Sequence, residues 1–321
     1  MSDLLTAAPA GGLDPTVSLV LDATDIRVSF PRPGKTPSTV IDGIGLGLER
    51  GQVTVLLGES GSGKTVFARA VTGLAPSSAI VAGSAVFDGV DLVSASTSAL
   101  RALHGDRIGM VPQDPNASLD PMRRIGSQIV ETLLQHRQAA NRAAARARAV
   151  ELLEQVQIHE PERVVRCYPH EVSGGMRQRI AIAIAISCGP ELIVADEPSS
   201  ALDASVGARV VGLLDDLRHR LHTAILFITH DIGIAALIAS QEHDRVAVML
   251  GGQIVELGFA PDVLRAPRHE YTQALLAAEP SGAVVRGHLA VVPDAVRSRR
   301  DWGPLREVAP GHAVATGSEL S

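Results

Sequence analysis

A glycine-rich stretch near residue 60 has the residue types and spacing of a phosphate-binding loop. It reads Gly58-Glu-Ser-Gly-Ser-Gly-Lys-Thr65: a glycine, four residues, a second glycine, then lysine and threonine. Glycines let successive backbone N–H groups turn toward phosphate oxygens, and a helix that follows adds the partial positive charge of its N-terminus. We expect Lys64 to reach the β- and γ-phosphates and Thr65 to hold Mg²⁺. The expected phosphate contacts are Gly58, Ser60, Gly61, Gly63, Lys64 and Thr65.

The segments on either side of this loop support the interpretation. An apolar run over residues 53–57 predicts a buried strand before the loop, and residues 66–74 predict a helix that stops near Gly73 and Pro76. The alternative is a glycine-rich turn without a ligand. A second Gly-Lys-Thr triplet begins at Gly34, but it lacks the upstream glycine. The strand, loop and helix together therefore favour the stretch at 58–65 as the nucleotide site.

A second, acidic segment supplies what a phosphate site needs for catalysis. The run Glu191-Leu-Ile-Val-Ala-Asp196-Glu197 predicts a buried strand that carries two carboxylates to the carboxyl edge of a sheet. Asp196 is placed to bind Mg²⁺ through water, and Glu197 to orient and activate the attacking water. The alternative is a strand that ends in ordinary surface acids. The phosphate-binding loop in the same chain favours the catalytic interpretation.

Composition limits the class of protein. The chain has 321 residues, 45 % apolar and only 2 % aromatic, which favours a core of aliphatic side chains, as in a parallel sheet under helices. The net charge of −6 argues against nucleic acid as the main partner. We expect no signal peptide, because the N-terminal residues carry Asp3 and Asp14 and no basic region, and no run approaches the roughly 20 apolar residues that span a bilayer. Cys167 and Cys188 lack metal-ligand spacing and are expected to be reduced thiols.

The chain divides into three parts by pattern. Residues 1–16 are expected to be a disordered leader, residues 17–278 one domain, and residues 279–321 a tail that is poorly structured or forms a small accessory element. Within the domain, strand and helix patterns alternate, and the pattern is helical from 125 to 158. A helical insertion is expected at about 113–189. The ranges with β-like patterns are 18–30, 40–48, 83–92, 108–111, 191–195, 224–229, 246–250 and 253–257.

The order of these motifs resembles the nucleotide-binding subunit of an ATP-binding-cassette (ABC) transporter. The family's Leu-Ser-Gly-Gly-Gln signature is matched by Val172-Ser-Gly-Gly-Met176, and its Ser-Ala-Leu-Asp loop by residues 200–203. Its glutamine loop is matched by Gln113 and its switch histidine by His230. The resemblance covers about residues 18–278. It implies an α/β fold: a P-loop NTPase core with a mixed sheet, an antiparallel β subdomain and an inserted helical subdomain.

The resemblance also assigns roles to these residues. The signature residues Ser173, Gly174 and Gly175 are implied to contact ATP bound to a second subunit, across a head-to-tail dimer. Asp203 is implied to communicate across that dimer. Gln113 is implied to contact Mg²⁺ or water and to transmit closure to the membrane subunit, and a plain loop residue is the alternative. His230 is implied to contact the γ-phosphate, and a buried structural histidine is the alternative.

The residue that stacks on adenine is left open by the sequence. Phe30 is the first candidate, because it ends a strand upstream of the phosphate-binding loop. Core packing is the alternative role for Phe30. Val40 is the alternative adenine contact, because the loop that follows Phe30 is long.

Longer stretches resemble one subgroup, the oligopeptide, dipeptide and nickel permease ATPases. These stretches are 113–121, 168–179 and 269–276. The subgroup implies a heterodimer with a second ABC ATPase, two integral membrane permease subunits, an extracytoplasmic solute-binding protein, and a place on the cytoplasmic face of the cell membrane. Many members hold an iron–sulfur cluster through C-terminal cysteines. No cysteine follows Cys188 here, so we expect ATP and Mg²⁺ but no such cluster.

Three other functions compete with an importer ATPase. An ABC protein of DNA repair or ribosomes works without a membrane, but such proteins usually have two cassettes or long coiled-coil insertions, which this chain lacks. The signature disfavours an unrelated P-loop ATPase or kinase. Intact Asp196, Glu197 and His230 disfavour a scaffold that binds ATP without hydrolysing it. Peptides, nickel, metal chelates and small glycosidic solutes all remain open as cargo, because cargo contacts lie on other chains.

Overall fold

The computed structural model describes residues 19–278, 292–299 and 302–316. The expected leader, residues 1–16, lies outside them. The chain forms two compact units, which are described separately. Of the described residues, the first unit takes in 19–49, 55–94, 239–278, 292–299 and 302–316, and the second Arg50–Thr54 and Ala95–Ile238.

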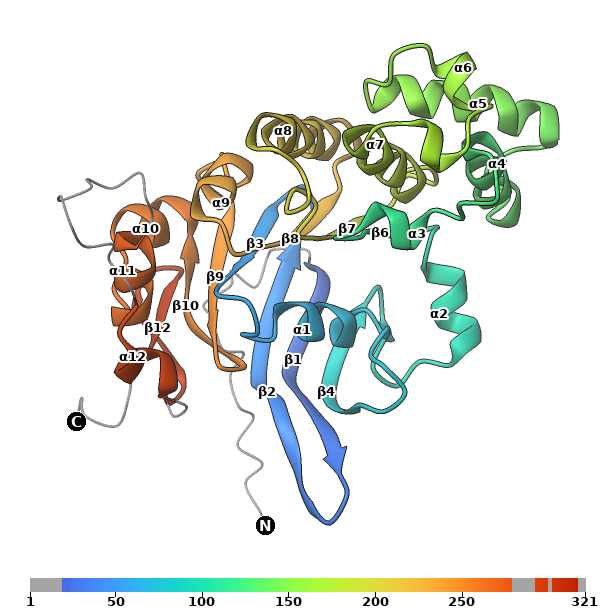
Figure 1. The fold of residues 1–321 in the computed structure, drawn as a ribbon. Helices are drawn as coiled ribbons and strands as arrows, with labels where there is room; N and C mark the ends of the chain where they lie inside the picture. Colours follow the sequence, from blue (N-terminus) through green and yellow to red (C-terminus); the bar gives the residue numbers. More distant parts are fainter. Residues whose placement is uncertain (1–18, 279–291, 300–301, 317–321) are drawn as a thin grey trace. The chain divides into compact units, whose positions relative to one another are not determined.

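An antiparallel sheet occupies the N-terminal part of the first unit. Its strand order is β2-β1-β4-β5, and its inner face is built from aliphatic side chains such as Ile26, Val28 and Ile41, all 0 % exposed. The first two strands form a long hairpin, drawn in blue in Figure 1. The bounds are β1 Leu19–Arg32, β2 Lys35–Glu49, β4 Ile80–Phe87 and β5 Val90–Asp91.

This hairpin differs from the expectation of a long loop after Phe30. Both strands continue through that region, and Arg32 pairs with Lys35. Gly34 has a φ of 68°, so the turn needs only the residues between these two strand ends. The prolines are tolerated because this end of the ladder is exposed.

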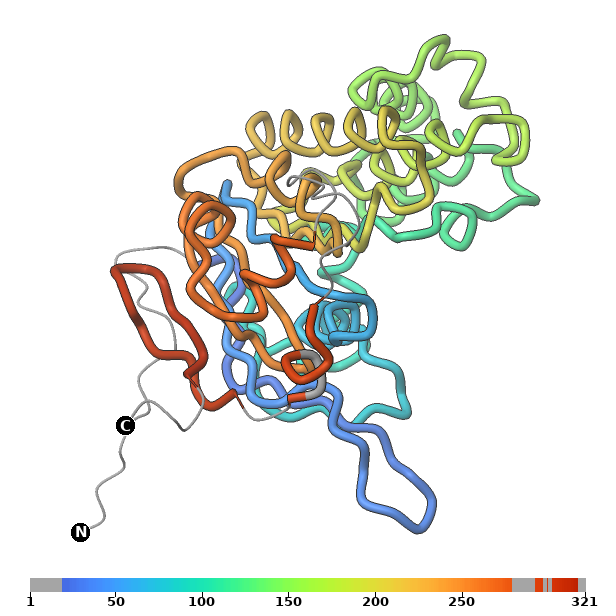
Figure 2. Tube along the Cα trace, turned by 60° about the vertical axis from the view of Figure 1, so that its left-hand side comes forward, coloured from blue at the N-terminus to red at the C-terminus, as the bar shows by residue number. Residues whose placement is uncertain are grey.

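The C-terminal part of the first unit forms a second antiparallel arrangement, in the order β11-β12-β10-β9. Its outer hairpin, β11 Leu305–Ala309 and β12 His312–Ala315, joins β10 through pairs such as Glu256↔Val314 (Figure 2, red). No clear pattern after Pro280 predicts this hairpin. One reason is that the interior of β11, residues 306–308, is exposed and carries no alternation. The other elements are α1 Lys64–Val71, β9 Arg245–Leu250, β10 Gln253–Phe259, α10 Ala260–Arg265, α11 Glu270–Ala277 and α12 Asp294–Ser298.

Three parallel strands organise the second unit. They are β6 Ile108–Val111, β7 Leu192–Asp196 and β8 Ala224–Thr229, with Ile108 beside Leu192 and Leu192 beside Ala224. Nearly every residue in them is buried, as expected for a parallel sheet covered on both faces. The strand β3, Val53–Leu57, starts in this unit and ends in the first. The flanking helices are α2 Thr97–Leu103, α8 Ala204–Leu221 and α9 Ile232–Ile238.

In the sequence, several helices follow β6 and precede β7. They are α3 Pro115–Ser118, α4 Ile125–Gln135, α5 Arg142–Gln155, α6 Pro161–Val164 and α7 Gly174–Ala185. The range 125–158, which the sequence predicts to be helical, holds two helices, α4 and α5. Arg137 has a φ of 57° just after α4, and the Asn141 side chain accepts the N–H groups of Ala143 and Ala144 to begin α5. Both helices bury an aliphatic stripe, so the apolar period alone does not show the break.

Candidate functional site

The phosphate-binding loop joins β3 to α1 in the first unit. All five residues of β3 are buried, so the strand is a rigid base for the loop. Lys64 opens α1 and is only 5 % exposed. Its Nζ donates hydrogen bonds to the carbonyl oxygens of Gly58, at 2.7 Å, and Glu59, at 2.9 Å. The ammonium group is therefore held inside the loop by the loop's own backbone.

The glycines of the loop are required by close approach. A Cβ on Gly58 would lie 2.3 Å from the carbonyl oxygen of Met249 in β9, and one on Gly63 would lie 2.7 Å from Cδ1 of Ile41. Gly63 also has a φ of 105° as the residue before α1. Both positions exclude a side chain, so the backbone of the loop packs directly against its neighbours.

The donor groups of the loop fit the phosphates of ATP. Ser62 is 5 % exposed, and its hydroxyl has no hydrogen-bond partner among the described residues. A buried polar group normally has a partner, so a bound anion is the natural acceptor here. Ser60 and Gly61 are exposed and accessible to a ligand. The loop thus offers a buried ammonium, a buried hydroxyl and the N-terminus of α1 to negative charge.

The second unit brings together three residues that are far apart in the sequence. Gln113 follows β6, Glu197 follows β7 and His230 follows β8, so all three stand at the same edge of the parallel sheet. Gln113 Nε2 donates a 3.2 Å hydrogen bond to Glu197 Oε2, and His230 Nδ1 lies 3.1 Å from Glu197 Oε1. Each carboxylate oxygen of Glu197 is therefore engaged by a different loop.

The backbone at Glu197 also favours a functional role. Glu197 has a φ of 45°, an uncommon conformation for a non-glycine residue that costs of order 1–3 kcal/mol. Its N–H donates to the carbonyl oxygen of Ile228 at 3.0 Å, which holds the turn in place. The side chain is 13 % exposed and His230 47 % exposed, and both line a cavity of ≈ 380 Å³. A carboxylate fixed in this way at the wall of a cavity is suited to accept a proton from water.

Three residues are expected to bind Mg²⁺: Thr65 in the first unit, and Gln113 and Asp196 in the second. Thr65 is half-buried in the first turn of α1, and Asp196 is half-buried at the end of β7. A hydroxyl and a carboxylate are hard oxygen ligands, which suit Mg²⁺. Among the described residues, no group of three or more His, Cys, Asp or Glu side chains is arranged to hold a metal ion.

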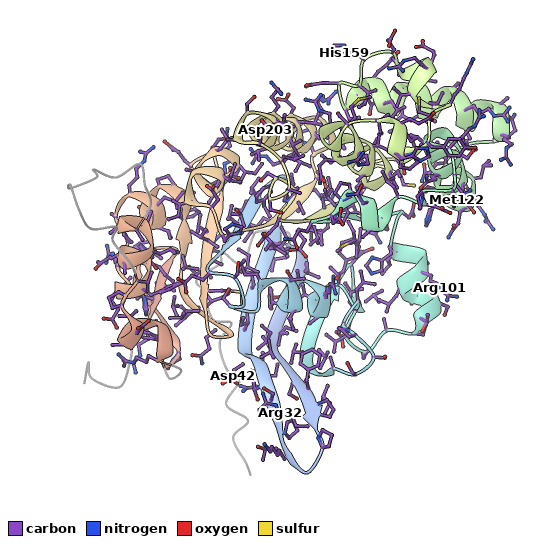
Figure 3. All side chains as sticks on the ribbon, viewed as in Figure 1. Arg32, Asp42, Arg101, Met122, His159 and Asp203 are labelled. Carbon is purple, nitrogen blue, oxygen red and sulfur yellow. The ribbon has the colours of Figure 1, made fainter. Side chains whose placement is uncertain are left out.

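The signature residues and Asp203 line a single cavity of ≈ 830 Å³ in the second unit. Ser173 caps α7 by accepting the N–H of Met176 at 3.3 Å, and Asp203 caps α8 by accepting the N–H of Val206 at 2.9 Å. Figure 3 shows Asp203 at the start of α8. Gly175 is needed because a Cβ there would lie 2.7 Å from Val206. The starts of two helices thus meet at this cavity, an arrangement that favours an anionic ligand. Its lining includes Ser173, Gly174, Gly175, Asp203, Arg163, Arg179 and Arg209.

The two candidates for adenine stacking differ in their surroundings. Phe30 is half-buried on β1 opposite Ser38, so its ring keeps an accessible part and is not a core residue. The carbonyl oxygen of Val40 lies 3.3 Å from the position of a Cβ on Gly63, which places Val40 beside the phosphate-binding loop. Both remain candidates.

Two residues of the site were not given roles by sequence. Tyr271 in α11 accepts the N–H of Glu59 in the phosphate-binding loop at 3.3 Å. Gln178 in α7, 1 % exposed, donates to the carbonyl oxygen of Pro112, next to Gln113, at 3.3 Å. These contacts join residues 212 and 66 positions apart. Only the fold shows such pairs, although both residues stand in stretches that resemble the permease ATPases.

Comparisons with known proteins agree with these features. A family model described as "ABC transporter" matches residues 41–200. The oligopeptide transport ATP-binding protein OppD of Bacillus subtilis is 43 % identical over 267 residues, which cover 83 % of this chain and 73 % of that protein. The probable peptide ABC transporter ATP-binding protein y4tR of Sinorhizobium fredii is 36 % identical over 94 % of this chain and 96 % of that protein.

A solved structure is similar in fold. It is the dimeric, post-hydrolysis ATP-binding cassette MJ0796 bound to ADP and Pi, with a TM-score of 0.65 and 26 % identity, covering 75 % of this chain and 98 % of that one. The expected fold class and the resemblance to permease ATPases are both confirmed. The chain therefore belongs to the ABC transporter family, in the branch of the oligopeptide ATP-binding subunits, and is an ATP-hydrolysing subunit of a transporter.

Proposed function

We propose that this chain drives the import of peptides, with Glu197 as the general base of ATP hydrolysis. The observation that carries the catalytic assignment is the Glu197 carboxylate held between Gln113 and His230, at 3.2 Å and 3.1 Å. The names of the relatives in Bacillus subtilis and Sinorhizobium fredii support peptide as the cargo. Nickel and metal chelates are the alternative cargo classes.

The proposed roles follow the two units. In the first, the loop 58–65 binds the phosphates through Lys64, Ser60 and the backbone, and Phe30 or Val40 contacts adenine. Thr65 is the proposed Mg²⁺ ligand of the first unit. In the second, Asp196 binds Mg²⁺ through water, Gln113 contacts Mg²⁺ or water, and His230 contacts the γ-phosphate. Glu197 takes a proton from the attacking water, and Gln113 transmits closure of the site to the membrane subunit.

The proposed assembly completes each site with a second subunit. Ser173, Gly174 and Gly175 of this chain contact ATP held by a second ABC ATPase in a heterodimer, and Asp203 communicates between the sites. Two integral membrane permeases and an extracytoplasmic solute-binding protein complete the importer, with this chain on the cytoplasmic face of the membrane. No helix among those described has both the length and the apolar character needed to cross a bilayer.

Replacing Glu197 by Gln tests the catalytic assignment. The substitution keeps the shape of the side chain but removes the base, so we expect kcat for ATP hydrolysis to fall by about 10²–10⁴-fold with ATP binding retained. Glu242, an exposed glutamate, provides the matched control: Glu242→Gln should hydrolyse ATP like the wild type. A Glu197→Gln enzyme with wild-type turnover would remove Glu197 from the reaction.

Transport is tested with the assembled complex. The chain is co-purified with its membrane subunits, reconstituted into lipid vesicles, and supplied with the binding protein and either peptide or nickel. We expect peptide to stimulate hydrolysis and to accumulate in an ATP-dependent manner. If nickel alone stimulated hydrolysis, nickel and not peptide would be the cargo. If the ATPase never associated with membrane proteins, the proposal that it belongs to an importer would be wrong.

A further inference from the structure

The C-terminal part of the first unit contacts the phosphate-binding loop through one side chain. Tyr271, in the first turn of α11, is 0 % exposed, and its hydroxyl oxygen accepts the backbone N–H of Glu59 at 3.3 Å. Glu59 is the second residue of the loop. A buried tyrosine hydroxyl that finds a partner in the loop, rather than in its own helix, is more than a packing contact.

The hydrogen bonds on both sides of Glu59 belong to one peptide group. The peptide that joins Gly58 to Glu59 is planar, so the Gly58 carbonyl and the Glu59 N–H point in opposite directions. The N–H donates to Tyr271, and the carbonyl accepts from Lys64 Nζ at 2.7 Å. Whatever fixes the N–H therefore also fixes the oxygen that holds the ammonium group. Consecutive hydrogen bonds through one peptide also strengthen each other.

We propose that Tyr271 is a positioning residue of the ATP site: it locks the Gly58–Glu59 peptide and so presets Lys64 for the phosphates. Gly58 gives this peptide little resistance to rotation, because glycine populates many backbone conformations. Met249 restrains one side of Gly58, and Tyr271 restrains the peptide that follows. The inference rests on the proposed binding of ATP phosphates by the loop.

The position of Tyr271 is itself fixed by buried polar groups. The N–H of Tyr271 donates to His269 Nδ1 at 3.1 Å, and the N–H groups of Arg268 and His269 donate to the Glu256 carboxylate at 2.8 and 3.2 Å. Glu256 is 0 % exposed and also lies 2.8 Å from Nε2 of His312. A buried charge is costly to leave without partners, so Glu256 and the residues that contact it have one favoured arrangement.

The tail beyond residue 300 contributes to this anchor. His312 belongs to β12, and the Trp302 ring meets His269 edge-on with 4.5 Å between ring centroids. The described residues of the tail, 302–316, thus hold the start of α11, and α11 holds the phosphate-binding loop. The segment whose sequence shows no clear periodicity becomes a support of the nucleotide site.

Replacing Tyr271 by Phe tests the role of the hydroxyl. Phenylalanine keeps the ring and its packing, so we expect the midpoint of thermal unfolding without nucleotide to change little. The Glu59 amide should exchange with deuterium faster than in the wild type, and the Kd for ATP should rise about 3- to 10-fold. The kcat at saturating ATP should stay within about twofold, because the catalytic group in the second unit is not changed.

The matched control is Tyr168→Phe, which changes the only other tyrosine of the chain, in the second unit. It should leave both the Glu59 exchange rate and the Kd for ATP unchanged. Lys64→Ala is measured in parallel and should greatly weaken ATP binding. If Lys64→Ala binds ATP like the wild type, the proposed phosphate site fails. If Lys64→Ala loses binding but Tyr271→Phe keeps wild-type affinity and exchange, only the role of Tyr271 fails.

Discussion

The two charged groups proposed for chemistry are held in different ways. The Lys64 ammonium rests on carbonyl oxygens of its own loop, at 2.7 and 2.9 Å. The Glu197 carboxylate instead depends on side chains from two other loops, those of Gln113 and His230. Any shift of Gln113 or His230 therefore frees one oxygen of Glu197.

At the residue scale, His269 predicts a dependence of stability on pH. Burial lowers the pKa of His269 from 6.5 to about 4, Glu256 opposes this shift, and Arg299 adds to it. Below pH 6.5 the unfolded chain binds a proton that the folded chain excludes, so stability is lost as the pH falls from 6.5 toward 4. The full loss from this residue is about 3 kcal/mol.

Urea unfolding at pH 7.5 and at pH 5 measures this loss. His269→Asn is the matched variant, because an asparagine oxygen can still accept the N–H of Tyr271 but does not titrate. We expect the difference in unfolding free energy between the two pH values to be smaller in the variant. An unchanged difference would show that other groups cause the acid sensitivity.

At the element scale, β6 and α7 meet without room for a side chain. A Cβ on Gly109 would lie 2.4 Å from the carbonyl oxygen of Ala185, the last residue of α7. Since backbone cannot yield as a flexible side chain can, Gly109→Ala should lower the unfolding free energy by about 1–3 kcal/mol or more. Gly212 is the matched control: it is exposed in α8 with nothing within 4 Å, so Gly212→Ala should raise stability by about 1 kcal/mol.

Urea unfolding of both variants gives the comparison directly. Equal effects of Gly109→Ala and Gly212→Ala would show that β6 moves away from α7 at little cost. The same variants should differ in ATPase activity, because Gly109 lies in the strand that leads to Gln113 and Gly212 does not.

The elements show which patterns predict structure well. The strand 224–229 has the bounds expected from its sequence, since it is a single buried run with clear ends. The break at Arg137 was missed because a left-handed arginine leaves no mark in the apolar period. The hairpin 305–315 was missed because its pairing with β10 depends on a distant partner.

At the scale of the whole molecule, the signature cavity predicts an assembly that depends on ATP. The helix starts at Ser173 and Asp203 open onto this cavity of ≈ 830 Å³. We expect the Glu197→Gln chain and its paired ATPase to form a stable dimer when ATP is added, seen by sedimentation velocity. Adding Ser173→Glu should abolish that dimer, since a carboxylate would face the γ-phosphate. A dimer unaffected by Ser173→Glu would place the signature outside the interface.

The candidate site was predictable in its residue types but not in its geometry. The spacing of Lys64 after Gly58 and the buried strand before Glu197 give the chemistry. The approach of Gln113 and His230 to one carboxylate follows from the order of three parallel strands, which a single sequence does not state. The contact of Tyr271 with Glu59 is harder still to predict from sequence, because the chain leaves the first unit after Glu59 and returns to it before Tyr271.

The β1–β2 hairpin has a practical consequence for labelling. The chain has only two lysines: Lys64, 5 % exposed, and Lys35, exposed at the start of β2 beside the hairpin turn. An amine-directed reagent therefore has one accessible lysine side chain to modify, in addition to the α-amino group of the chain. A fluorophore or a surface linkage on Lys35 leaves Lys64 of the nucleotide loop unmodified, so the hairpin gives a lysine attachment point away from that loop.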